Sequence, residues 1–460
     1  MTTHQPAPAG AEAAAAGPAS ALAQAAGREL DAMLAEADLA LARDYPGERQ
    51  GRQPVHTVYV PADKFRPGLP ADWGRQALQA LDRWAPDAAG FGAAMGVPPA
   101  LAADVRSLVL AKLAAEPVED LRLDFEDGYH PRPAAADADA AGDADARAAG
   151  DADAAEDADA RAAAQALAGA IAAGAAPPFT GLRCKSLEAG TRRRAIRTLD
   201  LFLASFLRRG PLPAGFVLTL PKVTSAAQVE AMAHLCDLLE RAHALTPGQL
   251  VFEVQVETPQ IVLGSDGTAT VARCVHAARG RLTGLHYGTY DYSASLGIAA
   301  AYQSIEHPAA DHARAVMQVA AAGTGVRLSD GSSNVLPAGR GDDVLAAWQL
   351  HSALVRRSLE RGFYQGWDLH PAQLASRYAA TYAFFREGLR PACARLRSYL
   401  GTASDGPGTA SDGVLEEPAT ARALAGYLAR ALDCGAASPP EVAELTGLDR
   451  AGMDALRDSG

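Results

Sequence analysis

Short apolar runs, with polar residues at alternate positions, are separated along this chain by longer runs whose apolar residues have helical spacing. The first pattern is typical of strands buried on at least one face, and the second of amphipathic helices. Helical patterns include residues 192–210 and 226–245. Eight segments have the strand pattern: residues 55–60, 121–126, 181–186, 215–222, 249–257, 281–288, 325–331 and 363–369.

This alternation predicts an α/β fold, a (β/α)8 TIM barrel. The alternative is a doubly wound sheet, which we disfavour because no glycine-rich phosphate loop follows the first strand. We assign the barrel domain to residues 28–400, with an N-terminal helical extension.

Four segments have another character. Residues 1–27 are rich in Ala, Pro and Gly, and we predict that they are disordered. Residues 134–178 repeat Ala and Asp without an apolar stripe until about Ala162, so we interpret them as a solvated low-complexity insertion, helical only near its end. Residues 401–413 duplicate GTASDG and predict a flexible linker. Residues 414–460 predict a small C-terminal helical extension, with Ser438 before two prolines as a helix start.

Composition narrows the class of protein. The net charge is −12, but residues 137–161 hold nine acids and two arginines, 2 − 9 = −7, so the acidity is largely local. No basic stripe suggests a nucleic-acid partner, and no apolar run is long enough to predict a membrane span. Five dispersed cysteines without CxxC spacing argue against disulfides or structural zinc and favour the cytoplasm.

Ionisable residues stand where the predicted strands end, which is where such a barrel places its chemistry. Asp124 and Glu126 share one face of their strand, and Asp127 takes the other unless a turn at Gly128 redirects it. Further strand ends carry charged residues: Arg183 and Lys185, Lys222, Glu257, and Asp291.

Carboxylates that face a barrel interior are costly to desolvate unless a cation neutralises them. Mg²⁺ usually takes one or two direct carboxylates and keeps several waters. We therefore expect Glu257 and Asp291 to bind Mg²⁺ directly, with Mn²⁺ as the alternative ion. The acids Asp124, Glu126 and Asp127 would hold the metal's waters.

Seven short motifs, in order, resemble those of the HpcH/HpaI aldolase and citrate lyase beta-subunit family, in an aldolase-like branch. The resemblance covers roughly residues 55–375 and implies a (β/α)8 barrel, a Mg²⁺ ion, carbon–carbon bond chemistry through an enolate, and a homo-oligomer, usually a trimer or hexamer. The motifs are VPADKF, LRLDFEDG, LRCKS, LPKV, QVETP, HYGTYDYSASLG and GWDLHPAQL.

The resemblance also implies roles for residues. Glu257 and Asp291 match the family's metal ligands, Arg183 matches the arginine that grips the substrate, and Lys222 matches a lysine near the site. The acids of DFED match those that hold metal-bound waters. Lys185 stands where the family usually has Asn, and Tyr290 where an acid is common; these departures leave the substrate open. We expect Arg183, Lys185 and Glu257 to contact it.

The favoured function is a Mg²⁺-dependent carbon–carbon lyase, or aldolase, acting on a small 2-oxo or hydroxy acid or an acyl-CoA thioester. Phosphoenolpyruvate-type enol or phosphoryl chemistry, and a non-catalytic metabolite-binding barrel, remain alternatives. The general base stays open among a water steered by Asp124 or Glu126, His286, and a group from another subunit. We interpret His370 as a loop or cap residue, and the trio His307, Asp311 and His312 as a helix start.

Overall fold

The computed structural model describes residues 18–130, 144–403 and 417–458. The chain forms two compact units, Met1–Pro46 and Gly47–Gly460. Helix α1 (Pro18–Asp44) belongs to the first unit, so residues 18–27, predicted to be disordered, are helical instead. Residues 1–17 lie outside the described part of the chain.

The second unit is built around eight parallel strands, which follow the order β7-β6-β5-β4-β3-β2-β1-β8. A parallel bridge between Ser329 and Gln365 joins the two outer strands and completes the ring. This confirms the predicted (β/α)8 barrel, and each strand falls within or next to a predicted segment. The strands are β1 (His56–Pro61), β2 (Asp120–Asp124), β3 (Phe179–Arg183), β4 (Phe216–Leu220), β5 (Phe252–Val256), β6 (Leu282–Tyr287), β7 (Arg327–Ser329) and β8 (Gly366–Trp367).

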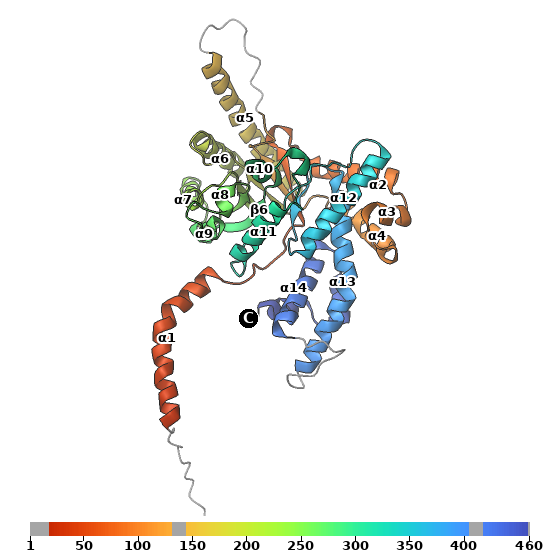
Figure 1. The fold of residues 1–460 in the computed structure, drawn as a ribbon. Coiled ribbons are helices and arrows are strands. Elements are labelled where there is room, and N and C mark those ends of the chain that lie inside the picture. Colours follow the sequence, from red (N-terminus) through yellow and green to blue (C-terminus); the bar gives the residue numbers. More distant parts are fainter. Residues whose placement is uncertain (1–17, 131–143, 404–416, 459–460) are drawn as a thin grey trace, which may run out of the picture. The chain divides into compact units, whose positions relative to one another are not determined.

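Helices between the strands surround the barrel, and the last helices extend from one end of it (Figure 1). They are α2 (Leu69–Trp84), α3 (Ala88–Met95), α4 (Pro99–Ala115), α5 (Ala144–Ala172), α6 (Arg192–Leu207), α7 (Ala226–Ala242), α8 (Pro259–Val262), α9 (Thr270–Ala277), α10 (Thr289–Ser295), α11 (Pro308–Ala321), α12 (Gly341–Glu360), α13 (Gln373–Ala403), α14 (Pro418–Cys434), α15 (Pro439–Thr446) and α16 (Arg450–Asp458), with two 3-10 turns at Ala62–Lys64 and Ala300–Tyr302.

The Ala/Asp-rich segment corrects the sequence interpretation. Residues 144–172 form α5, the helix that joins β2 to β3, and it packs on α6. Its inner face consists of small apolar residues such as Ala160, Ala164 and Leu167, all fully buried. Two buried acids, Glu156 and Asp157, pair with arginines of α6. The segment is therefore part of the barrel wall rather than a solvated insertion; its residues 134–143 lie outside the described chain.

The C-terminal segments follow the prediction with one change of boundary. Helix α13 continues to Ala403, so the first three residues of the predicted linker are helical, and residues 404–416 are not described. Helices α14, α15 and α16 form the predicted helical extension. The Ser438 side chain caps α15 by accepting a hydrogen bond from the backbone N–H of Glu441, 3.3 Å away, as its position before two prolines suggested.

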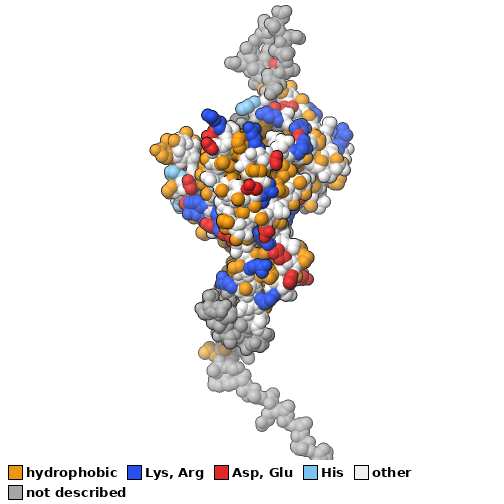
Figure 2. Space-filling model, turned by 90° about the vertical axis from the view of Figure 1, so that its right-hand side faces the viewer, with side chains coloured by type: hydrophobic (Ala, Val, Ile, Leu, Met, Phe, Trp, Pro, Cys, Tyr) orange, Lys and Arg blue, Asp and Glu red, His pale blue; other side chains and the backbone are white. Residues whose placement is uncertain are grey.

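Two further observations concern the surface and hydropathy. On the face drawn in Figure 2, acidic and basic side chains are interspersed among hydrophobic ones. Within the described residues, no single helix has the length and hydropathy of a membrane span; only the sharply bent pair α3 and α4 meets that test jointly.

The interior of the barrel contains a charged layer below the strand ends. Arg122 of β2 donates two hydrogen bonds to Glu253 of β5, at 3.1 and 2.9 Å, and also pairs with Asp120. All three are buried. Arg122 and Asp120 share one strand face, as expected for residues two apart, and both lie with Glu253 in the barrel interior. The mutual pairing offsets the cost of burying charge and fixes the floor on which the strand ends meet.

Candidate active site at the carboxyl ends of the strands

Because all strands are parallel, their carboxyl ends meet at one end of the barrel. Asp124 and Arg183 are the last residues of β2 and β3. Lys222 and Glu257 follow the ends of β4 and β5, and Asp291 lies in the first turn of α10, just after β6. Sequence reasoning therefore selected residues that the fold brings to the same end.

Arg183 is held by a two-point contact with Asp124. Its Nε and Nη2 atoms each lie 2.7 Å from one oxygen of that carboxylate. The guanidinium also lies 4.7 Å from the centre of the Tyr59 ring, and its Nη1 atom is 3.3 Å from Glu126. Burial acts to lower the pKa of Arg183, but Asp124 outweighs it and holds the pKa above its ordinary value. Arg183 is thus charged and fixed in orientation, with Nη1 directed toward Glu126 and Asp127 at the carboxyl end of the barrel, which forms the mouth of the site.

The stretch after Asp124 is a turn, not a continuation of the strand. The Asp124 carboxylate accepts hydrogen bonds from the backbone N–H groups of Glu126 and Gly128, both at 3.0 Å. A Cβ on Gly128 would lie only 2.9 Å from Asp124, so glycine suits this turn. The turn directs Asp127 toward Arg183, at 3.7 Å, and Lys222, at 3.3 Å. Asp127 therefore joins the site, which strand alternation alone did not predict.

Lys222 is the cation at the centre of the mouth. Its φ of 54° is in the left-handed region, which non-glycine residues rarely adopt. In this conformation its backbone N–H donates to Glu257 at 2.7 Å, while its ammonium lies 2.5 Å from Asp291 and 3.9 Å from Glu126. Burial acts to lower the pKa of Lys222, but the surrounding carboxylates, Glu257 foremost, hold it above its usual value. Such backbone strain is common at functional sites.

Glu257 is a buried carboxyl group at the base of the mouth, only 1% exposed. One oxygen accepts from Lys222, and the other lies against Gly288, where a Cβ would be 2.7 Å away. Burial raises the pKa of Glu257 to about 7, despite the nearby positive charges of Lys222 and Arg183. Glycine at position 288 thus leaves room for a carboxylate that the protein holds at an energetic cost.

The mouth holds more negative than positive charge. Burial, together with the neighbouring Asp127 carboxylate, raises the pKa of Glu126 to about 8. With every group ionised, two cations face five carboxylates, 2 − 5 = −3. The cations are Arg183 and Lys222, and the carboxylates are Asp124, Glu126, Asp127, Glu257 and Asp291.

The donor chemistry fits a hard divalent cation, because buried surplus carboxylates are what such an ion neutralises. Across the described residues, no three His, Cys, Asp or Glu side chains are grouped as a metal-binding set. Oxygen ligands of this kind suit a hard cation that takes one or two direct carboxylates and keeps several waters. Glu257 and Asp291 suit the direct positions, since Asp124 is already committed to Arg183.

Two predicted residues lie elsewhere. The Lys185 ammonium donates to the carbonyl of Phe125 at 2.8 Å and pairs with Glu156 of α5 at 3.2 Å. The Lys185 ammonium thus pairs with a carboxylate of α5. His286, a candidate general base, is buried in the charged layer, with its Nε2 atom 3.0 Å from Glu253 and its Nδ1 atom accepting from a tryptophan. It is not placed at the mouth.

His370 and His307 each accept a hydrogen bond from the backbone at a chain turn. His370 accepts a hydrogen bond from the backbone N–H of Ala372 at 3.2 Å, as expected for a cap residue. His307 caps the start of α11 in the same way, accepting from Ala309. Asp311, in the first turn of that helix, pairs with arginines. This agrees with the interpretation of 307–312 as a helix start.

Sequence reasoning missed two residues of the site. Tyr59, on β1, packs beneath the Arg183 guanidinium, and its hydroxyl lies 3.5 Å from Glu253. Gln255, on β5, lies 3.5 Å from Arg183, and its buried amide nitrogen has no hydrogen-bond partner within the described residues. Tyr59 shares a strand face with Thr57, so a search for inward polar residues along β1 would have found it.

The sequence profile of a family described as "Domain of unknown function (DUF6986)" matches residues 34–152 and 148–459. No curated protein matches the chain.

Solved structures are similar at low sequence identity. A citrate lyase beta subunit from M. tuberculosis, complexed with oxaloacetate and magnesium, is 17% identical, with 72% of this chain and 97% of that one covered and a TM-score of 0.39. A Haloferax volcanii malate synthase magnesium/glyoxylate complex is 14% identical, with 90% of this chain and 100% of that one covered and a TM-score of 0.44. An HpcH/HpaI aldolase/citrate lyase family protein from Burkholderia cenocepacia J2315 is 15% identical, with 75% of this chain and 96% of that one covered and a TM-score of 0.38.

Proposed function

We propose that this chain, which belongs to the DUF6986 family, is a Mg²⁺-dependent carbon–carbon lyase that acts through an enolate on a small 2-oxo or hydroxy acid or an acyl-CoA thioester. The observation that carries the proposal is the surplus of carboxylates around Lys222 and Arg183 at the catalytic end of the barrel. The motif resemblance supports the same reaction class. The implied homo-oligomer, a trimer or hexamer, remains a prediction.

Glu257 and Asp291 would hold the metal, with Mn²⁺ as the alternative ion. Bound there, the ion would supply Lewis-acid stabilisation of the negative charge that develops on the substrate's carbonyl oxygen. Arg183 binds and orients the substrate carboxylate through Nη1, since Asp124 already holds its other edge. The buried Gln255 amide, next to Arg183, is a further donor for a substrate oxygen.

Glu126 is the residue we propose for proton transfer. Its pKa of about 8 is close to neutrality, which suits a group that must both accept and return a proton. In the cleavage direction, the Glu126 carboxylate accepts the proton of the hydroxyl group on the carbon that becomes a carbonyl. The electron pair of the broken carbon–carbon bond passes to the enolate, whose carbon then takes the proton that Glu126 accepted. Lys222 keeps the neighbouring carboxylates charge-balanced during this cycle.

The phosphoenolpyruvate alternative is less favoured, because Arg183, Lys185 and Lys222 would together have to bind the anionic ligand, and Lys185 pairs with Glu156 instead. The test is a panel of 2-oxo acids, hydroxy acids and CoA thioesters, with products identified by mass spectrometry in Mg²⁺ and in EDTA. We expect one substrate class to be cleaved only with Mg²⁺, and Glu257→Gln to abolish cleavage while the circular dichroism spectrum is unchanged. Full activity in EDTA-treated protein would contradict the proposal.

A further inference from the structure

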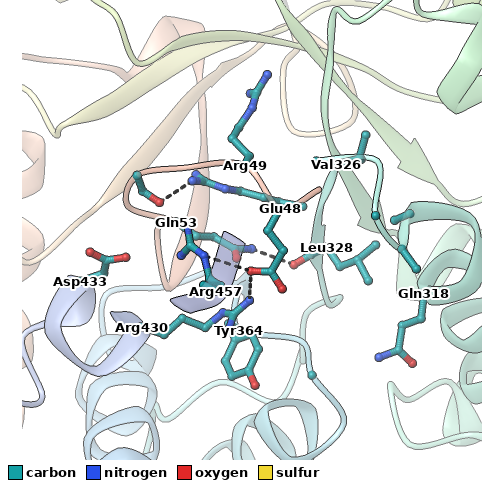
Figure 3. Close-up of a pocket in the computed structure, with 17 residues that line it drawn as sticks. Glu48, Arg49, Gln53, Gln318, Val326, Leu328, Tyr364, Arg430, Asp433 and Arg457 are labelled. Atoms are coloured by element: carbon teal, nitrogen blue, oxygen red, sulfur yellow. Dashed lines mark hydrogen bonds and ion pairs between the residues drawn. The ribbon is translucent and has the colours of Figure 1, made fainter. Parts of the chain in front are cut away.

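A cavity of about 230 Å³ opens at the amino-terminal ends of the strands, opposite the candidate active site. Arg327, the first residue of β7, lines it, as do Tyr364 just before β8 and Gln53 just before β1. The C-terminal helices α14 and α16 add Arg430 and Arg457 (Figure 3). The cavity is therefore assembled from the barrel floor and the C-terminal extension.

Positive charge gathers in this cavity although the chain as a whole is acidic. Four arginines and two acids line it, 4 − 2 = +2, against a net −12 for the chain. Helices α11 and α12 end at its rim, and each C-terminus adds a partial charge of about −0.5. The cavity thus keeps about one positive charge. The arginines are Arg49, Arg327, Arg430 and Arg457, and the acids are Glu48 and Asp433.

Two of these arginines have no carboxylate partner among the described residues. Arg327 donates to the backbone carbonyls of Arg52 and Gly51, both at 2.6 Å. Burial, and then the repulsion of Arg49, lowers the pKa of Arg327 to about 10. Arg49 makes no hydrogen bond or ion pair with any residue that the structure describes. Such groups are ready donors for an anion.

Glu48 shows how an anion sits in the cavity. Its carboxylate lies 3.0 Å from Nη2 of Arg430 and 3.9 Å from Nε of Arg457, and Figure 3 shows both arginines converging on it. The Tyr364 ring, 4.5 Å from the Arg430 guanidinium, supports that side chain from below. The Glu48 side chain is 53% exposed, so its ion pairs are weak and an external anion can displace it.

We propose that this cavity binds a small phosphate-bearing ligand. Displacement of Glu48 leaves about two positive charges, which matches a phosphate group at neutral pH. Guanidinium groups bind phosphate oxygens through pairs of parallel hydrogen bonds, and Arg430 and Arg49 lie at the cavity with donors to offer. The volume is below that of sites for drug-sized ligands, so the ligand is small. This inference does not depend on the lyase reaction.

The test is calorimetric titration of the full-length, EDTA-treated protein with inorganic pyrophosphate in phosphate-free buffer. Arg430→Gln and Arg49→Gln should each weaken binding by about tenfold, the loss expected for one charged hydrogen bond. Glu48→Gln should tighten it severalfold, because the competing carboxylate is gone. Arg193→Gln, an exposed residue of α6 outside the cavity, removes the same charge and should change nothing.

Arg49→Gln guards against misfolding as an explanation, since this exposed side chain has no partner to lose. Unchanged pyrophosphate affinity in both arginine variants would overturn the assignment, as would weaker binding by Glu48→Gln. Binding of the dicarboxylate malonate as tightly as pyrophosphate would overturn the choice of phosphate. Affinity lost equally in Arg193→Gln would reveal non-specific charge attraction and also overturn the proposal.

Discussion

The pair formed by Asp124 and Arg183 offers a test in which stability and function separate. Both side chains are nearly fully buried, and two 2.7 Å contacts join them. Removing one partner of a buried pair costs about 3–5 kcal/mol, because the other charge is left uncompensated. After Asp124→Asn, Glu126 at 3.3 Å still compensates part of the Arg183 charge. We therefore expect a loss at the lower end, about 3 kcal/mol.

Urea unfolding, followed by circular dichroism at pH 7.5, measures this loss. Arg183→Met should destabilise by a similar amount. The double variant should lose less than the sum by about 2 kcal/mol, because no unpaired charge remains, yet it should stay inactive. Arg273→Gln breaks an exposed pair as the control and should cost less than about 0.5 kcal/mol. A cost below about 1 kcal/mol for Asp124→Asn, with additive double-variant energies, would refute this reasoning.

The raised pKa of Glu126, about 8, means that the folded protein binds this proton more tightly than the unfolded chain does. The free energy of unfolding therefore falls as the pH rises from about 4.5 to about 8. In urea unfolding, Glu126→Gln should be more stable than wild type by about 2 kcal/mol at pH 8.5 and equal to it at pH 4. Gly288→Ala places a Cβ 2.5 Å from that of Glu257. In thermal unfolding this variant should lose about 1–3 kcal/mol of stability, and it should bind Mg²⁺ more weakly. An unchanged stability and an unchanged Mg²⁺ affinity would contradict the close packing. Asp157→Asn should lower the free energy of unfolding by about 1–2 kcal/mol, since it pairs with two arginines of α6, whereas the exposed Asp151→Asn should have no effect.

The positions of Arg183, Glu257 and Asp291 could be predicted because parallel strands leave only one end for their final residues. The alternation of polar and apolar residues also marks the face of β5 from which Glu253 and Gln255 contact Arg122 and Arg183. The left-handed backbone of Lys222 could not be predicted, because no glycine or asparagine marks it. Nor could the direction of Asp127, which depends on two backbone N–H groups bonding to Asp124.

The Ala/Asp tract shows a different limit. Hydrophobic periodicity is weak when a buried helix face consists of alanine, so α5 resembled a solvated linker in sequence. Its packing is decided by Glu156 and Asp157, whose partners on α6 lie some forty residues further along the chain. The cationic cavity was also hidden, because its arginines come from four separate segments that meet only in the folded protein.

The central claim is that Glu257 and Asp291 bind a divalent cation at the mouth of the barrel. Calorimetric titration of the EDTA-treated protein with Mg²⁺ tests it most directly. We predict one saturable site per chain in the wild type, weakened at least about tenfold by Glu257→Gln and by Asp291→Asn, and unchanged by the exposed Asp266→Asn. Equal Mg²⁺ affinity in all four proteins would contradict the account.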